Sequence, residues 1–320
     1  MTAIAVKKEK KIKKFQKPTN QNGPRLKDRV IAYSVMVEMA NPNGEVDTGG
    51  PRITSTGHNI MSPFSVKRKI RDLILRGDSD PWISDIAKGV ESSRRQVYES
   101  DARGYIEMKP YDAAKAALVE ARDDPASFLN RYIDVRLFGA LAISDMKDED
   151  NCSFNSKYEG CVQVAFPKSI SPVTPYISSH GKKCPVDQSN SDKDGTGTLA
   201  PDGIKVDEHA VLFGHIIVNG HQAGENGATD ADIDFLERMI PHLFDDRSAQ
   251  RVGVHVISAL SVQPDNRVYF PSNQFHIIQS MRPSLKDGVS FPKSYDDYEF
   301  PTADSVAKAF NGVKVVDLTV

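Results

Sequence analysis

Residues that could bind phosphate gather between Arg52 and Arg71. This stretch contains five basic residues and no acid, although the whole chain has a formal net charge of −2. Arginine and lysine side chains donate hydrogen bonds to phosphate oxygens, and arginine often does so through two parallel bonds. The types and spacing of these residues therefore indicate contacts to the sugar–phosphate backbone of a nucleic acid.

The loop before Arg52 is unusually rich in turn-forming residues. An apolar run ends at the sequence NPNG, residues 41–44, and more turn residues follow. A chain that only reverses direction needs about two residues, so the extra length suggests that the loop contacts a ligand. Glycine lets a phosphate approach the backbone closely. Four backbone amides of this loop could take part: those of Asn43, Gly44, Gly49 and Gly50.

The cations after the loop lie on a predicted amphipathic helix. Ser62 followed by Pro63 is typical of a helix N-terminus. With Val66 on the buried side, Lys67 and Arg71 lie one turn apart on one flank, where they suit successive phosphates, and Lys69 lies on the opposite flank. An ordinary basic surface is the alternative interpretation. The apolar positions of the helix are Val66, Ile70, Leu73 and Ile74.

Four strands and two helices are predicted to form the core, in the order β-α-β-β-α-β. The strands are expected at residues 30–39, 161–166, 208–220 and 252–262. The second helix begins at Thr229 and carries acidic residues in its first turn. This order is typical of an α+β, ferredoxin-like fold that RNA-recognition modules also use.

The apolar positions predict which face of each element is buried. In the first strand they are Ile31, Tyr33, Val35, Val37 and Met39. In the fourth strand they are Val252, Val254, Val256, Leu260 and Val262. In the second helix they are Ile233, Leu236, Ile240 and Leu243, with Asp230 and Asp232 in the first turn.

Two long insertions interrupt the core, and loops of this length are uncommon unless they are functional. Further helices are expected near residues 110–122 and 125–133, and a buried segment near 135–143. The chain is accordingly divided into a basic flexible arm (1–28), a first strand and helix (29–75), a first insertion (76–160), a core strand (161–166), a second insertion (167–207), the remaining core (208–262) and a C-terminal extension that packs on the core (263–320).

The charge of the chain is strongly segregated. Residues 1–29 contain ten basic residues and two acids, a local charge of +8, which leaves −10 for the remainder. A solvated tail and a non-specific phosphate-binding arm are the two interpretations of this segment. Three cysteines are too few for a disulfide framework, and no apolar stretch is long enough to span a bilayer. We therefore expect a cytoplasmic protein.

Other site chemistries have weaker support. Cys152, Cys161, His180 and Cys184 are ligand types for tetrahedral zinc, but their outer spacings are loose, and buried or idle thiols are the alternative. An acidic run (Asp145, Asp148, Glu149 and Asp150) could bind a metal, but such runs are usually solvated loops. We expect no metal, cofactor or catalytic residue. Arg247 and Arg251, after the second helix, are either a second phosphate clamp or caps for the helix C-terminus.

Five motifs in order resemble the CRISPR-associated Cas-seven family, the repeated backbone subunit of type I Cascade effector complexes, and the type I-C and I-B groups most of all. They are NPNG followed by PR, SVKRKIR, RLFGA, GCVQVAFPKSISPVTP and FDDRSAQR. They run from about residue 30 to residue 262.

The resemblance implies a fold and a function. It implies an RRM-like palm in which 76–160 are fingers and 167–207 a thumb hairpin. Several copies would line up along one guide RNA (crRNA), beside other Cascade subunits, and present it for pairing with target DNA in antiviral defence. The residues expected to contact RNA are Asn41, Asn43, Gly44, Arg52, Lys67, Arg68, Lys69, Arg71, Lys168, Arg247 and Arg251.

Two alternatives remain open. Related backbone subunits of type III complexes cut RNA with a loop aspartate, and Asp47 is the candidate here, although a solvated turn residue is the favoured interpretation. The other alternative is a single-copy RNA-binding protein of RRM-like fold. Occupancy of one guide by several copies would distinguish it from a backbone subunit.

Overall fold

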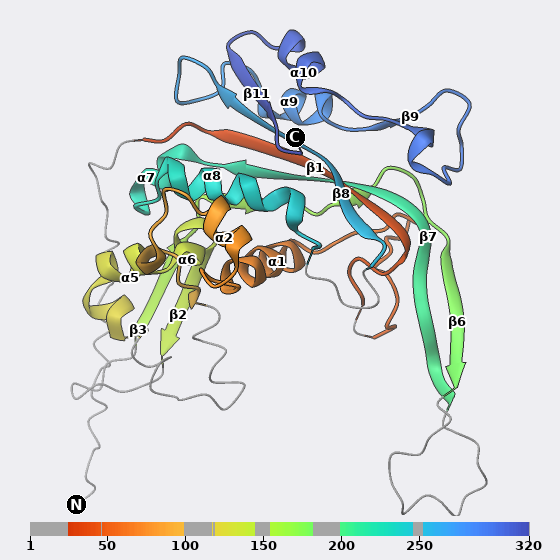
Figure 1. Ribbon diagram of the computed structural model, residues 1–320, viewed down its shortest axis with the longest axis horizontal. Coiled ribbons are helices and arrows are strands. Elements are labelled where there is room, and N and C mark those ends of the chain that lie inside the picture. Colours follow the sequence, from red (N-terminus) through yellow and green to blue (C-terminus); the bar gives the residue numbers. More distant parts are fainter. Residues whose placement is uncertain are drawn as a thin grey trace, which may run out of the picture. The chain divides into compact units, whose positions relative to one another are not determined.

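The chain is an α+β protein of helices and antiparallel strands (Figure 1). The computed structural model describes residues 25–45, 47–98, 117, 119–144, 154–181, 199–245 and 252–319. These residues form two compact units, each built from segments distant in the sequence. Unit 1 takes its described residues from 25–27, 74–163 and 218–235, and unit 2 takes them from 28–73, 164–217 and 236–319.

A seven-stranded sheet follows the order β11-β8-β1-β7-β4, and β5 and β6 also pair with β7. Its strands are β1 (Arg29–Ala40), β4 (Val162–Val164), β5 (Lys168–Ser169), β6 (Pro175–Gly181), β7 (Leu199–Val218), β8 (Val254–Pro264) and β11 (Val313–Asp317). β8 is antiparallel to β1 and β11, and β7 is antiparallel to β5 and β6. In Figure 1 the β6–β7 hairpin extends away from the rest of this sheet.

The four predicted core strands are all present, but two differ strongly in length from the prediction. The second is only Val162–Val164, and the third begins at Leu199 instead of residue 208. The added half of β7 pairs with β6, from Pro175↔Asp207 to Gly181↔Leu199. This pairing satisfies the backbone groups of a polar segment that shows no apolar alternation, so periodicity could not predict it.

β1 is buried on both faces. Ile31, Tyr33 and Val35 are at most 1% exposed on the predicted face. Val30 and Ala32 are buried on the other face, in a cluster with residues of α9 (Gln274–Ser280) and α10 (Ala303–Ala309). The cluster consists of Val30, Ala32, Phe213, Leu260, Val262, Ile277, Ile278, Met281 and Val306.

Two of the predicted strand positions are wrong. Met39 is 57% exposed and has a φ of 45°, so the chain leaves the extended conformation there and the alternation ends. Val252 is 55% exposed and lies before β8 begins. Both residues follow the apolar pattern of their strands but lie outside the regular pairing.

A β-bulge divides the predicted face of β8. Ser34 pairs with Ser258, but Val35 pairs with Val256, so β8 has one extra residue between these pairs. One extra residue reverses the side of the sheet on which the following side chains lie. Leu260 and Val262 therefore share the face of Ala32 and Val30, while Val254 and Val256 lie on the opposite face.

Both predicted core helices are confirmed as α1 (Pro63–Leu75) and α8 (Asp230–Met239). The four apolar residues of α1 are at most 4% exposed, and those predicted for the second helix are at most 2% exposed. The apolar stripe of the second helix continues through the 3₁₀ helix η3 (Ile240–His242). The remaining C-terminal elements are β9 (Ser284–Leu285), η5 (Tyr295–Asp297) and β10 (Tyr298–Glu299).

Unit 1 has its own core. Its elements are α2 (Pro81–Ile86), η1 (Ser92–Arg94), α5 (Pro125–Arg131), α6 (Ile133–Phe138), β2 (Gly139–Ser144), β3 (Phe154–Glu159), α7 (Gly220–Glu225) and the first part of α8. The predicted helix at 125–133 is therefore confirmed as α5, while the segment at 135–143 divides between α6 and β2. None of the helices in the described ranges has both the length and the apolar character needed to cross a bilayer.

A buried ion pair connects distant segments of unit 1. The side chains of Arg136 and Asp232 are both 0% exposed, and Arg136 Nη2 lies 2.8 Å from Asp232 Oδ1. Arg136 also donates to the carbonyl oxygens of Leu129, Asn130 and Arg94 at 2.7–3.0 Å. Asp232 Oδ2 accepts from Thr229 N at 2.9 Å. This network satisfies two buried charges, and one sequence segment alone cannot complete it.

We predict that Asp232→Ala lowers the free energy of unfolding by about 3–5 kcal/mol, because it leaves the guanidinium of Arg136 buried without its counter-charge. Urea denaturation would measure the loss. Asp123→Ala is the matched control, since Asp123 pairs with Arg122 at the surface, where ion pairs contribute about 1 kcal/mol or less. An equal loss of unfolding free energy in the two variants would contradict the role of Asp232 as the counter-charge of Arg136.

Candidate nucleic-acid interface

The loop after β1 is closed by its own backbone. Glu45 N donates to Gly50 O at 2.7 Å, and Gly49 N donates to Glu45 O at 2.8 Å. Gly49 has a φ of 65°, a left-handed conformation that favours glycine. A β-bridge between Gly44 and Pro51 then completes the turn. The turn residues of the sequence thus form one compact loop that leads directly to Arg52.

The chain next folds into a short hairpin, residues 52–60, that is joined to the sheet. Within the hairpin, Ile60 N donates to Arg52 O at 2.9 Å, and Ile53 forms a bridge with Asn59. Ile60 also forms a bridge with Lys168 of β5, and Lys168 pairs with Phe213 of β7. A continuous ladder of backbone pairs therefore connects the hairpin to the sheet of unit 2.

This ladder sets Arg52, Ile60 and Lys168 opposite one another on three adjacent strands. Residues directly opposite in antiparallel strands project from the same face. Neighbouring strands are about 4.8 Å apart, so the Cα atoms of Arg52 and Lys168 are separated by about 10 Å. We call these two cations, with Ile60 between them, the cationic row. Two long basic side chains at this separation can bind phosphates of a single strand.

The two cations of the row differ in their partners. Arg52 Nη1 lies 3.4 Å from Glu45 Oε2, and Arg52 Nε donates to Gly44 O at 3.3 Å. Both side chains of this ion pair are about one-third exposed, so water screens their attraction. Lys168 is exposed, and it has no ion pair within the described part of the chain. Arg52 is therefore oriented by the loop, whereas Lys168 projects into solvent.

The asparagines of the loop hold its backbone. Asn43 Oδ1 accepts from Ser62 N at 2.7 Å, which fixes the loop to the start of α1. Asn41 is buried, and its Nδ2 donates to Gly49 O at 3.3 Å. The sequence predicts Asn41, Asn43 and Gly44 as RNA contacts. In the structure, both carboxamides take part in bonds that maintain the loop.

The cations of α1 fall into three different environments. Lys67 is partly buried, and this burial, followed by the charge of Arg71, lowers the pKa of its ammonium. The interaction agrees with the predicted position of Lys67 and Arg71 on one flank. Arg68 is exposed, and its Nε lies 2.5 Å from Asp72 Oδ1, one turn further along the helix.

Lys69, which the sequence places on the opposite flank and predicts as an RNA contact, is a buried cation. It is 8% exposed, and its Nζ lies 4.3 Å from the centre of the Phe244 ring. A cation over an aromatic face is stabilised by the ring quadrupole. The charge of Lys69 is thus directed at an interior ring, and the helix wheel alone could not reveal the partner.

Two residues beside the row were not predicted from the sequence. His58 lies at the turn of the hairpin, and its Nδ1 is 3.1 Å from Thr56 Oγ1. Partial burial lowers the pKa of His58, and the charges of Lys168 and Arg282 lower it further. Arg282, which is exposed and follows α9, therefore lies close enough to act on the hairpin. Its only sequence signal is an arginine directly before Pro283.

Several predicted site residues lie outside the described residues. They are Arg247, Arg251, Cys152, Cys184 and the acidic run at 145–150, and the side chain of His180 is not described either. Cys161 is fully buried, and burial raises the pKa of its thiol to about 12. Among the described residues, no three His, Cys, Asp or Glu side chains are arranged to hold a metal ion. Asp47 is exposed in the turn of the loop.

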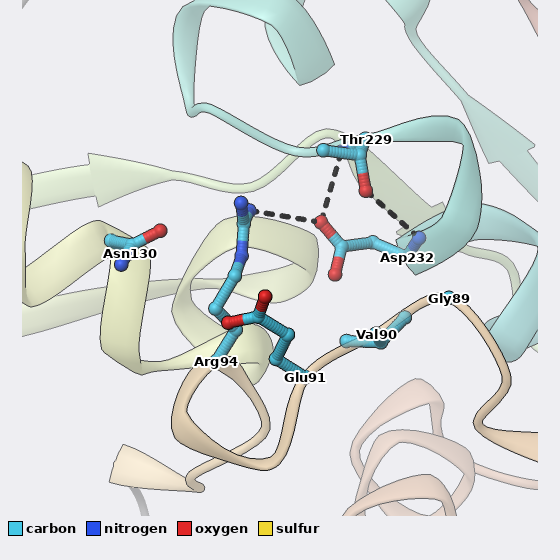
Figure 2. A pocket seen from close by; sticks show the side chains of 7 residues that line it. All are labelled: Gly89, Val90, Glu91, Arg94, Asn130, Thr229 and Asp232. Carbon is cyan, nitrogen blue, oxygen red and sulfur yellow. Dashed lines mark hydrogen bonds and ion pairs between the residues drawn. The ribbon is translucent and has the colours of Figure 1, made fainter.

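A polar hollow in unit 1 contains none of the predicted RNA-contact residues. It has a volume of about 310 Å³ and is lined by Gly89, Val90, Glu91, Arg94, Asn130, Thr229 and Asp232. Figure 2 shows Arg94 and Thr229 directed at the carboxylate of Asp232. Arg94 Nη2 lies 3.5 Å from Asp232 Oδ2 and donates to Gly227 O at 3.0 Å. These groups bind one another, so the hollow is part of the network that holds unit 1 together.

Comparison with known proteins identifies a family. The profile of CRISPR-associated protein Cas7 matches residues 27–303. No curated protein matches the chain. One similar solved structure is described as a CRISPR RNA-guided surveillance complex, pre-nicking, with 13% identity, a TM-score of 0.46 and coverage of 82% of this chain and 84% of the other. Another, a CRISPR RNA-guided surveillance complex, has 12% identity, a TM-score of 0.43 and coverage of 82% and 78%.

We predict that Asn43→Ala destabilises the loop, because it leaves Ser62 N without its acceptor. The expected decrease in the free energy of unfolding is about 1 kcal/mol. Asn43→Asp, which keeps an acceptor oxygen in place, should restore most of the loss. Urea denaturation of both variants would measure the effect, and an unchanged stability of Asn43→Ala would show that this bond does not support the loop.

Proposed function

Because the chain belongs to the family of CRISPR-associated protein Cas7, we propose that it is a guide-RNA-binding backbone subunit of an RNA-guided surveillance complex. Several copies bind one crRNA, beside the other subunits of a Cascade-like complex. Base pairing between the guide and the target DNA supplies the sequence recognition, while the protein holds the RNA backbone. The subunit has no catalytic step of its own.

The cationic row is the observation that carries this proposal. Arg52 and Lys168 lie on one face of the strand ladder, and the ladder fixes the distance between them. A binding site for a regular polyanion needs cations at fixed spacing and in one orientation. Cations whose backbone positions are fixed by strand pairing meet this need better than cations on a flexible segment.

Further RNA contacts extend from the row. Lys67 and Arg71 lie on one flank of α1, which Asn43 joins to the loop. Arg282 extends the positive surface beyond Lys168. Asn41, Asn43 and Gly44 act in this proposal by maintaining the loop, and Lys69 has no role in RNA binding because its charge is directed at Phe244.

The sheet of unit 2 is the ferredoxin-like palm in this proposal. The predicted first, second, third and fourth core strands are β1, β4, β7 and β8. They follow the order β8-β1-β7-β4 in the sheet, which is fourth, first, third, second. This order supports the split β-α-β arrangement expected from the sequence. The five motifs between residues 30 and 262 favour a type I-C or I-B system.

We predict that the double variant Arg52→Ala/Lys168→Ala binds single-stranded guide RNA at least about tenfold more weakly at low salt, because two charged hydrogen-bond donors are removed. The slope of log K against log salt should decrease in magnitude by roughly 1.4, which corresponds to two phosphate contacts. Filter binding over a salt series would measure both quantities.

The matched control for this variant is Arg267→Ala/Lys314→Ala. It removes an equal charge from exposed residues of the same unit, and Lys314 lies on β11 at the far side of β8 from β1. The control should retain nearly all of the affinity. Equal losses in the two double variants would mean that total charge, and not the cationic row, determines binding.

The β6–β7 hairpin is the thumb that contacts the next copy in this proposal. Tyr176 and Ile177 of β6 are 45% and 65% exposed and project from opposite faces of the strand, so each face of the hairpin offers one apolar side chain for contact with another copy. The residues between β6 and β7 that the sequence assigns to the thumb lie outside the described residues.

We predict that Tyr176→Ser/Ile177→Ser reduces the number of copies on each guide without unfolding the subunit. The measurement is co-expression with a CRISPR repeat–spacer transcript, followed by sequencing of the bound RNA and mass determination of the particle. The unaltered chain should give several copies per guide. One copy per RNA for the unaltered chain would support a single-copy RNA-binding protein, and a normal copy number for the variant would exclude these two residues from the contact.

A further inference from the structure

Asn59 and Asp207 form a buried polar pair between the hairpin and β7. Both residues are 0% exposed, and Asn59 Nδ2 donates to Asp207 Oδ2. Asn59 belongs to the 52–60 hairpin, and Asp207 lies in β7, opposite Pro175 of β6. The pair therefore connects the segment that carries Arg52 with the base of the β6–β7 hairpin.

Each member of the pair has one buried oxygen without a partner. These atoms are Asn59 Oδ1 and Asp207 Oδ1, and neither has a hydrogen-bond partner among the described residues. A buried acceptor without a donor costs about 1–3 kcal/mol, so two in one pair need a physical account. Both orphaned atoms are acceptors, so a further contact between them requires a proton.

A protonated carboxyl group supplies that proton. In a neutral Asp207 the O–H on Oδ1 donates to Asn59 Oδ1, while Asn59 Nδ2 continues to donate to Asp207 Oδ2. The two groups then form a closed pair with two hydrogen bonds, and both orphaned oxygens are satisfied. An ionised Asp207 is an acceptor only, so it can form just one of these bonds.

Among the side chains that the structure describes, none supplies a counter-charge for an ionised Asp207. The described charged and titratable residues on the elements joined to Asp207 are Arg52 and His58 on the hairpin, Lys168 on β5, Tyr176 on β6, and Glu208 and His209 on β7. None of them forms an ion pair or hydrogen bond with Asp207 among the described residues. Burial raises the pKa of Asp207 to about 6, and the bond from Asn59 only partly opposes this.

We propose that Asp207 is a positioning residue that the folded protein holds as a neutral acid in mildly acidic solution. In this form it binds Asn59 through two hydrogen bonds and fixes the hairpin against β7. The pair adds to the bond from Asn59 N to Ser169 Oγ at 3.1 Å, which joins the same hairpin to β5. The inference concerns folding and needs no RNA.

The pair makes the stability of the fold depend on pH. The folded state raises the pKa of Asp207 from its ordinary value of 3.8 to about 6, so the folded state binds the proton more tightly than the unfolded state. The stabilisation from this group is complete below about pH 4 and is lost as the pH rises through about 6. The shift corresponds to roughly a hundredfold decrease in the folding equilibrium constant.

The variant Asp207→Asn provides the decisive test. An asparagine at this position can exchange two amide hydrogen bonds with Asn59 without any proton. Urea denaturation of the full chain should show Asp207→Asn about tenfold above the unaltered protein in folding constant at pH 5 and about a hundredfold above it at pH 8, because an unfolded Asp207 with its ordinary pKa of 3.8 is already ionised at pH 5. Asp207→Ala should be at least tenfold lower than the unaltered protein at pH 5, because it cannot form either bond.

The matched control is Asp47→Asn, which makes the same substitution at an exposed aspartate. This substitution should leave the change in folding constant between pH 5 and pH 8 the same as in the unaltered protein. If Asp207→Asn is as unstable as Asp207→Ala at both pH values, the ionised carboxylate is required and the proposal is wrong. If Asp207→Asn keeps the full pH dependence of the unaltered protein, another group titrates and the proposal is also wrong.

Discussion

The candidate interface depends on the pairing of one short strand. β5 has only two residues, yet it joins the 52–60 hairpin on one side to β7 on the other. Through this pairing the backbone of the sheet determines where Arg52 and Lys168 lie, so the spacing of the two cations does not depend on their own flexible side chains. The buried pair of Asn59 and Asp207 acts on the same connection through side chains, and Asn43 joins the loop to α1 in a similar way.

Much of the fold follows from local patterns in the sequence. The periodicity of apolar residues located both core helices and all four core strands, because burial of one face imposes a period of 3.6 or 2 on the side chains. The errors arise where the backbone conformation interrupts the alternation of buried and exposed side chains. The bulge in β8 places the side chains before it and after it on opposite faces of the sheet. The positive φ of Met39 ends the alternation of buried and exposed side chains in β1. Pairing also created the long first half of β7, whose polar sequence has no such period.

The sequence identified the residue types of the interface better than their partners. Arg52 is partly exposed, and Lys67 and Arg71 lie on one flank of α1 as the helix periodicity predicts. Lys69 differs from them only in facing Phe244, a residue distant in the sequence, so no local rule separates these cations. Arg282, which follows α9, acts on His58 of the hairpin across a long distance in the sequence, so no local pattern could reveal its position. The charge of a side chain can be predicted locally, but its environment is set by tertiary structure.

The ion pair between Arg52 and Glu45 has a consequence for selectivity. Glu45 lies 3.4 Å from the guanidinium and belongs to the loop itself, so it acts as an internal counterion. A phosphate that approaches Arg52 competes with this carboxylate, and each such contact contributes less free energy than it would at an unpaired arginine. In the proposed arrangement of several copies on one guide, the RNA accumulates these small gains and binds firmly. A small anion gains the free energy of only one such contact and therefore dissociates rapidly.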